Sequence, residues 1–126
     1  MTVQRILIID DMKDTVLTMQ RLFQSFDYEV AVAFDGKSGI EKAHEFLPDV
    51  ILCDIGLPGE ADGYAVARAL RNTQQFRTIL LIAVTGYGTE EDKQRCLEAG
   101  FDWHLPKPID SIALAETLKN RSVEIP

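Results

Sequence analysis

The chain has 126 residues, which fits one domain, because domains commonly contain about 100 to 200 residues. Hydrophobic residues make up 46% and charged residues 26%, a composition typical of globular proteins and unlike that of disordered chains. The net charge of -7 argues against direct binding to nucleic acid, because a phosphate backbone attracts basic proteins.

The start of the chain shows no signal peptide or membrane span. Its apolar run from Ile6 to Ile9 stops at Asp10 and is too short for either. We therefore expect a cytoplasmic protein that does not enter a membrane. Cys53 and Cys96 stand far apart without a CxxC or Cys/His cluster, so neither a disulfide framework nor a zinc site is indicated. Both are expected to be buried.

Short apolar runs alternate with segments of helical period along the chain. This alternation predicts βα units around a parallel sheet. The middle runs are continuously apolar, which is typical of strands covered on both faces. We expect strands at residues 5–9, 28–33, 50–53, 79–84 and 102–105.

Two segments between these strands repeat apolar residues at helical spacing. Their members are Met19, Leu22, Phe23 and Phe26 in the first, and Ile40, Ala43, His44 and Leu47 in the second. Each set predicts a helix face that packs on the core. His44 has no partner motif, so we expect a helix residue that is packed or half-exposed, without a ligand role.

Helix ends are marked by residues suited to capping. Asp35, Thr89 and Asp110 each precede a predicted helix, where a side-chain oxygen can accept from free backbone amides. Gly100 is expected to end the fourth helix, because glycine adopts the left-handed conformation found there. Residues 122–126 are expected to form a loose tail.

Polar side chains follow four of the predicted strands. They are Asp10 and Asp11 after the first strand, Asp54 after the third, Thr85 after the fourth and Lys107 after the fifth. In open parallel sheets, ligands bind beyond the carboxyl ends of the strands. We therefore expect these side chains to converge on one edge of the sheet.

Three neighbouring carboxylates repel one another unless they share a cation. A set of oxygen ligands without Cys or His favours Mg²⁺. Water molecules and a phosphate from the ligand can complete its coordination shell. A carboxylate can also act as a nucleophile and form an aspartyl phosphate, while the metal and an ammonium group neutralise charge on the transferring oxygens. Together these residue types indicate phosphoryl transfer.

Four separated motifs make the sequence resemble bacterial response-regulator receiver domains. They are the acid pair in ILIIDDMKD, the run LCDIGLPG with Asp54 and Pro58, VTGYG with Thr85, and HLPKPID with Lys107. The resemblance covers residues 3–121 and implies a single receiver domain. It also implies a flavodoxin-like (βα)5 fold, a doubly wound parallel five-stranded sheet with strand order 2-1-3-4-5.

The resemblance implies a magnesium-dependent phosphoacceptor site. Asp54 would accept the phosphoryl group and also contact the metal. Asp11 would bind the metal directly, Asp10 would help mostly through water, and Gly56 would contribute its backbone carbonyl. Mn²⁺ could substitute for Mg²⁺. The loop between Pro58 and Gly63 is one residue longer than the usual family pattern.

The resemblance also implies how the signal leaves the site. Thr85 would hydrogen-bond the attached phosphoryl group and Lys107 would form an ion pair with it. His104 stands where the family has its switch aromatic and would move inward behind Thr85. A cis peptide is expected before Pro108. A downstream effector would bind the face made by the fourth helix, fifth strand and fifth helix.

The expected function is that of a phosphoacceptor receiver in a two-component or phosphorelay system. The donor would be a phosphohistidine on a sensor histidine kinase or a histidine phosphotransfer protein. Such a domain catalyses only its own phosphorylation and slow dephosphorylation, and so is not an enzyme in the usual sense. A receiver fragment of a hybrid histidine kinase is an alternative with the same chemistry.

Three other functions fit the residues less well. An aspartyl-phosphate phosphatase requires a second acidic residue two positions after the nucleophile, where this chain has Gly56. A flavodoxin-like electron carrier needs a phosphate-cradling loop after the first strand, where Asp10 and Asp11 would repel a phosphate. A binding module that is never phosphorylated would not need every acceptor and activator position, yet all are present.

Overall fold

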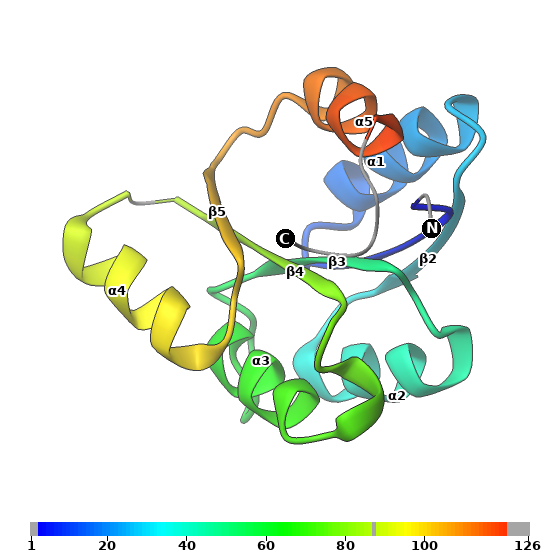
Figure 1. Ribbon diagram of the computed structural model, residues 1–126. Helices are drawn as coiled ribbons and strands as arrows, with labels where there is room; N and C mark the ends of the chain where they lie inside the picture. The colour runs from blue at the N-terminus through cyan, green and yellow to red at the C-terminus, as the bar shows by residue number, and fades with distance from the viewer. Residues whose placement is uncertain (1–2, 87, 121–126) are drawn as a thin grey trace.

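The structure is a computed structural model that describes residues 3–86 and 88–120. Five parallel strands form one sheet in the order β2-β1-β3-β4-β5 (Figure 1). The strands are β1 (Arg5–Ile9), β2 (Glu29–Ala33), β3 (Val50–Asp54), β4 (Leu80–Thr85) and β5 (Trp103–Pro106). The predicted fold and strand order are therefore confirmed.

Helices follow the strands in alternation, as predicted. They are α1 (Lys13–Ser25), α2 (Gly36–Phe46), α3 (Gly63–Arg71), α4 (Glu90–Ala99) and α5 (Ser111–Lys119), with a short 3-10 helix, η1 (Gln74–Phe76), before β4. Figure 1 shows α1 and α5 on one face of the sheet and α2 and α3 on the other, with α4 beside β5. Among the described residues, no helix is both long and apolar enough to span a bilayer.

The central strands β1, β3 and β4 are buried on both faces, which explains their continuous apolar runs. In β1, Ile6 and Ile8 pack in the cluster that contains α1 and α5, whereas Leu7 and Ile9 pack in the cluster with α2, α3 and α4. This alternation follows from the two-residue period of a strand. Cys53 and Cys96 are free and buried, as expected.

The helix-cap predictions are confirmed. Asp35, Thr89 and Asp110 accept from the backbone N–H groups of Ser38, Asp92 and Ala113. Gly100 ends α4 with a φ of 114°, in the left-handed region. The predicted tail, residues 122–126, and Arg121 lie outside the described residues.

The predicted core face of α2 needs a correction. The helix ends at Phe46, and Leu47 follows in the left-handed conformation with 51% of its surface exposed. His44 is also exposed, although its ring lies edge-on to Phe76 with ring centres 5.0 Å apart. The buried positions of α2 are Gly36, Gly39 and Ala43, small residues that let the helix lie close to the sheet. The spacing therefore placed Ile40 and Ala43 correctly on the core side, but it was wrong for His44 and Leu47.

Candidate functional site

The acidic side chains meet at the carboxyl edge of the sheet. Asp10 follows β1, and Asp54 is the last residue of β3. Carboxylate oxygens of Asp10, Asp11 and Asp54 all lie within 4.8 Å of one another. Asp10 and Asp54 are buried with 4% and 6% exposure, whereas Asp11 is exposed. The parallel pairing of β1 with β3 thus brings together acids that are distant in sequence.

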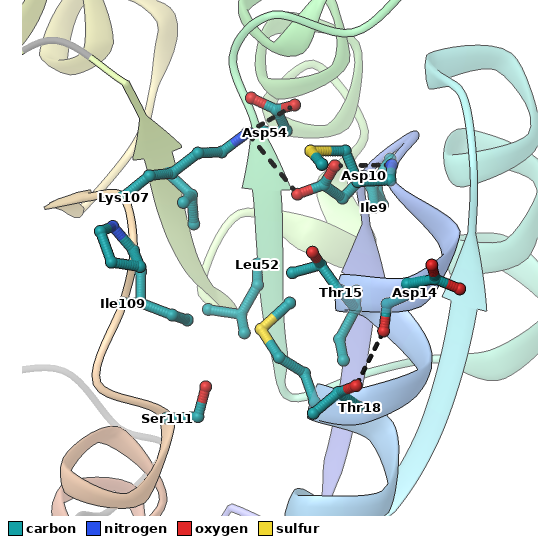
Figure 2. A pocket seen from close by; sticks show the side chains of 15 residues that line it. Ile9, Asp10, Asp14, Thr15, Thr18, Leu52, Asp54, Lys107, Ile109 and Ser111 are labelled. Carbon is teal, nitrogen blue, oxygen red and sulfur yellow. Dashed lines mark hydrogen bonds and ion pairs between the residues drawn. The ribbon is translucent and has the colours of Figure 1, made fainter.

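Backbone amides and Lys107 hold the two buried carboxylates in place. Oδ1 of Asp10 accepts from the N–H of Met12, and Oδ1 of Asp54 accepts from the N–H of Gly56, each at 3.0 Å. The other oxygens face Lys107, whose Nζ lies 3.1 Å from Asp54 Oδ2 and 3.8 Å from Asp10 Oδ2 (Figure 2). One ammonium group therefore serves two buried carboxylates.

Lys107 and Thr85 are positioned by the adjacent ends of β4 and β5. Thr85, the last residue of β4, is buried, and its carbonyl accepts from the N–H of Lys107 at 2.8 Å. The peptide between Lys107 and Pro108 is cis, as the family resemblance implied. The backbone thus places the threonine hydroxyl and the lysine ammonium at the same edge as the acids.

The electrostatics of the cluster favour an added cation. Burial raises the pKa of the Asp10 carboxyl above its usual range, and the Asp54 and Asp11 carboxylates raise it further. The Met12 amide and the Lys107 ammonium act in the opposite direction. Because the gathered donors are carboxylate oxygens, the site fits a hard cation such as Mg²⁺.

Gly56 lies in the loop after β3, and His104 lies in β5. Gly56 is bound through its N–H to Asp54 in the loop after β3, beside the acid cluster. His104 in β5 is paired with Ala83 of β4. Residues 83 and 85 share a face of their strand, so His104 and Thr85 lie on the same side of the sheet. Among the described residues, the buried His104 Nε2 has no hydrogen-bond partner.

A pocket of about 600 Å³ extends from Asp54 and Lys107 between α1 and the segment after β5 (Figure 2). Its walls are mostly apolar side chains. They include Met12 and Met19 from the α1 side, Leu52 and Val84 from the sheet, and Ile109 before α5. Sequence reasoning missed this pocket, because the periodicity of α1 indicated only a core-facing stripe. It did not show that α1 and α5 leave a gap beside the acids.

Comparison with known proteins decides the family. A family model described as response regulator receiver domain matches residues 6–119. The chain belongs to this family. It is therefore a receiver domain of two-component signalling, and its sheet and helices are those of the chemotaxis-regulator fold.

Several receiver proteins show the extent of the similarity. The response regulator PleD of Caulobacter vibrioides is 36% identical over 110 residues, which are 87% of this chain and 24% of PleD. The chain thus spans about a quarter of that relative. DivK of Brucella ovis, a polar-differentiation response regulator, is 30% identical over 115 residues, with 91% of this chain and 93% of DivK covered.

A solved structure adds a metal to the comparison. The receiver domain of the sensor histidine kinase PA1611 from Pseudomonas aeruginosa has a TM-score of 0.81 and 30% identity, covering 93% of this chain and 95% of that one. That structure holds a magnesium ion in its active-site cleft. The relatives described here are signalling proteins, and none of them supports the phosphatase alternative.

Proposed function

We propose that Asp54 is the phosphoacceptor of this receiver and takes one phosphoryl group from a phosphohistidine. The observation that carries the proposal is the contact of 3.1 Å between Asp54 Oδ2 and Lys107 Nζ inside the acid cluster. The Asp54 carboxylate can act as the nucleophile, and the neighbouring Lys107 ammonium group supplies positive charge for an incoming phosphate. The proposed receiver domain spans residues 3–121, followed by a tail at 122–126.

The reaction transfers a phosphoryl group from nitrogen to oxygen. An Asp54 oxygen forms the new P–O bond as the P–N bond to the donor imidazole breaks, and the imidazole leaves with the electron pair and takes up a proton. Lys107 would pair with the phosphoryl oxygens, and the Thr85 hydroxyl would donate a hydrogen bond to one of them. The chain would catalyse only this step and the slow loss of its own phosphoryl group.

Asp10, Asp11, Asp54 and the backbone carbonyl of Gly56 would hold Mg²⁺, and Mn²⁺ could replace it. When bound, the metal neutralises charge on the phosphoryl oxygens. The gathered carboxylates and the raised pKa of Asp10 support this assignment. The similar domain with magnesium in its cleft supports it as well.

The pocket beside Asp54 is the proposed approach for the histidine donor. Its apolar walls lie next to the acceptor, so a helix that carries the phosphohistidine could bury an apolar neighbour there. We propose a sensor histidine kinase or a histidine phosphotransfer protein as this donor, acting in the cytoplasm without nucleic acid or membrane contact. The same chemistry would operate if the chain were the receiver of a hybrid histidine kinase.

The output is proposed to pass through Thr85 and His104. These side chains share a face of the sheet, and His104 lines a pocket of about 240 Å³ with Lys93, Cys96 and Leu97 of α4. Movement of Thr85 toward a phosphoryl group would open space that the His104 ring can enter. An effector that binds the α4, β5 and α5 face would then meet a changed surface.

Phosphorylation itself tests this function. Purified chain is incubated with acetyl phosphate, with and without Mg²⁺, and its intact mass is recorded. We expect a single added phosphoryl group that requires Mg²⁺ and is lost in Asp54→Asn. The exposed Asp27→Asn variant is the matched control and should label as wild type. Labelling of Asp54→Asn at the wild-type rate would contradict the assignment.

A further inference from the structure

The first residue of α3 lies directly on the backbone of Asp54. A Cβ atom added to Gly63 would stand 2.5 Å from the Asp54 carbonyl oxygen and 2.6 Å from the Ile55 Cα. These separations are shorter than any packed pair of such atoms tolerates. The N–H of Gly63 also donates to the Ile55 carbonyl at 3.0 Å. The start of α3 therefore supports the peptide that carries the phosphoacceptor.

The surroundings leave this contact little freedom to relax. The N–H of Ile55 donates to the Val84 carbonyl of β4 at 3.1 Å, which ties the peptide after Asp54 to the sheet. On the other side, α3 is held by Tyr64, a residue with 5% exposure whose ring centre lies 4.3 Å from the guanidinium carbon of Arg95 in α4. The start of α3 and the peptide after Asp54 are therefore both held in place. A side chain at position 63 must displace the backbone of Asp54 and Ile55.

Displacement of Asp54 matters because of what its side chain does. Its Oδ1 is fixed by Gly56 and its Oδ2 by Lys107, so a shift of the peptide disturbs both contacts. A nucleophile misplaced by about 1 Å can slow a reaction by roughly 100-fold. We propose that Gly63 is a positioning residue for phosphoryl transfer, an inference that rests on Asp54 being the phosphoacceptor.

Other glycines of the chain provide controls for this role. A Cβ atom on Gly39 would come 2.6 Å from Ile9 Cδ1, a side-chain end in the core, so the substitution strains packing without pressing on Asp54. For Gly88, no atom of the described residues would lie within 4 Å of the added carbon. A Cβ atom on Gly36 would press on the backbone carbonyl oxygen of Ala61, in the loop that joins Asp54 to α3.

The experiment compares Gly63→Ala, Gly39→Ala and Gly88→Ala with wild type. Labelling by acetyl phosphate is followed at saturating Mg²⁺ and expressed per folded molecule, with the folded fraction taken from urea unfolding curves. We expect Gly63→Ala to label about 10-fold more slowly or worse. Gly39→Ala should lose stability yet label at the wild-type rate, and Gly88→Ala should change neither. Labelling of folded Gly63→Ala within twofold of wild type would overturn the proposal.

A second variant keeps the test valid if Gly63→Ala does not fold. Gly36→Ala should slow labelling roughly threefold, because displacement of Ala61 also shifts the loop between Asp54 and Gly63. A wild-type rate in folded Gly36→Ala would then count against the proposal. If wild type itself took up no phosphoryl group, the proposed function would fail and the role of Gly63 with it.

Discussion

Asp10 and Asp54 are buried carboxylates that share one ammonium group. The raised pKa of Asp10 has a direct consequence for stability. Because the folded state holds the Asp10 proton more tightly than the unfolded state does, this group favours folding below its ordinary pKa of 3.8. That contribution is lost as the pH rises through the raised value, so ionised Asp10 costs stability at neutral pH.

Asp10→Asn should therefore stabilise the metal-free protein at pH 7. The amide keeps an oxygen for the Met12 N–H but removes a charge that Asp54 and Asp11 repel. We expect a gain on the order of 1 kcal/mol in the free energy of unfolding, measured with urea in EDTA. The gain should vanish below pH 3.8 and shrink with Mg²⁺ present. A less stable variant at pH 7 in EDTA would contradict this.

The principal site residues could be placed from sequence because each ends a strand or directly follows one. Asp10, Asp54, Thr85 and Lys107 all reach one edge of the sheet once the strand order is known. The support from Gly63 could not be placed in the same way. This support depends on the close approach of α3 to the backbone after β3, and the spacing of residues in the sequence does not predict such an approach.

At the level of elements, Arg71 joins the end of α3 to three other segments. Its guanidinium donates to the carbonyls of Phe76, Arg77, Ile79 and Gly100 and to the carboxylate of Asp102, at 2.7 to 3.0 Å. The same Asp102 oxygen accepts from the N–H of Leu81 in β4. One side chain thus fixes η1, the end of α4 and the approach to β5.

Arg71→Ala should destabilise the fold by about 2 to 3 kcal/mol, since several partly buried carbonyls and a carboxylate lose a charged donor. Arg71→Lys should recover only part of this, because an ammonium group cannot reproduce the planar fork of five donors. Urea unfolding measures both values. Labelling of Asp54 per folded molecule should stay at the wild-type rate, and a lysine variant as stable as wild type would show that charge alone suffices.

The elements themselves were largely predictable, with limits set by tertiary contacts. Strand positions followed from apolar runs and helix starts from capping residues such as Asp35 and Thr89. Leu47 was misplaced because the helical pattern extended one residue past the actual end of α2, where the backbone turns left-handed. The role of Arg71 was missed because most of its partners are backbone carbonyls, which every residue type has.

At the scale of the whole molecule, phosphorylation at one edge of the sheet is proposed to alter the face made by α4, β5 and α5. A partner that binds one of two conformations of this face more tightly shifts their equilibrium only by the difference between its two affinities. We expect a coupling free energy of about 1 to 3 kcal/mol between phosphorylation and partner binding. The proposed path runs through Thr85 and His104, which share a side of the sheet.

Amide NMR with beryllofluoride, an unreactive mimic of the phosphoryl group, tests this path. Thr85→Ala and His104→Ala should still bind the mimic at Asp54, but chemical-shift changes over residues 89–120 should be smaller than in wild type. Thr78→Ala, an exposed threonine before β4, is the control and should respond fully. Changes of wild-type size in both test variants would exclude this route.

The identity of the residue that carries the phosphoryl group, proposed to be Asp54, can be determined directly. Borohydride reduces an acyl phosphate to an alcohol, so treatment of the labelled chain marks the acceptor permanently, and peptide mass spectrometry then locates it. We predict conversion of Asp54 to homoserine, only after phosphorylation with Mg²⁺ present, and no conversion of the neighbouring Asp10 or Asp11. Reduction at another acid, with Asp54 unchanged, would contradict it.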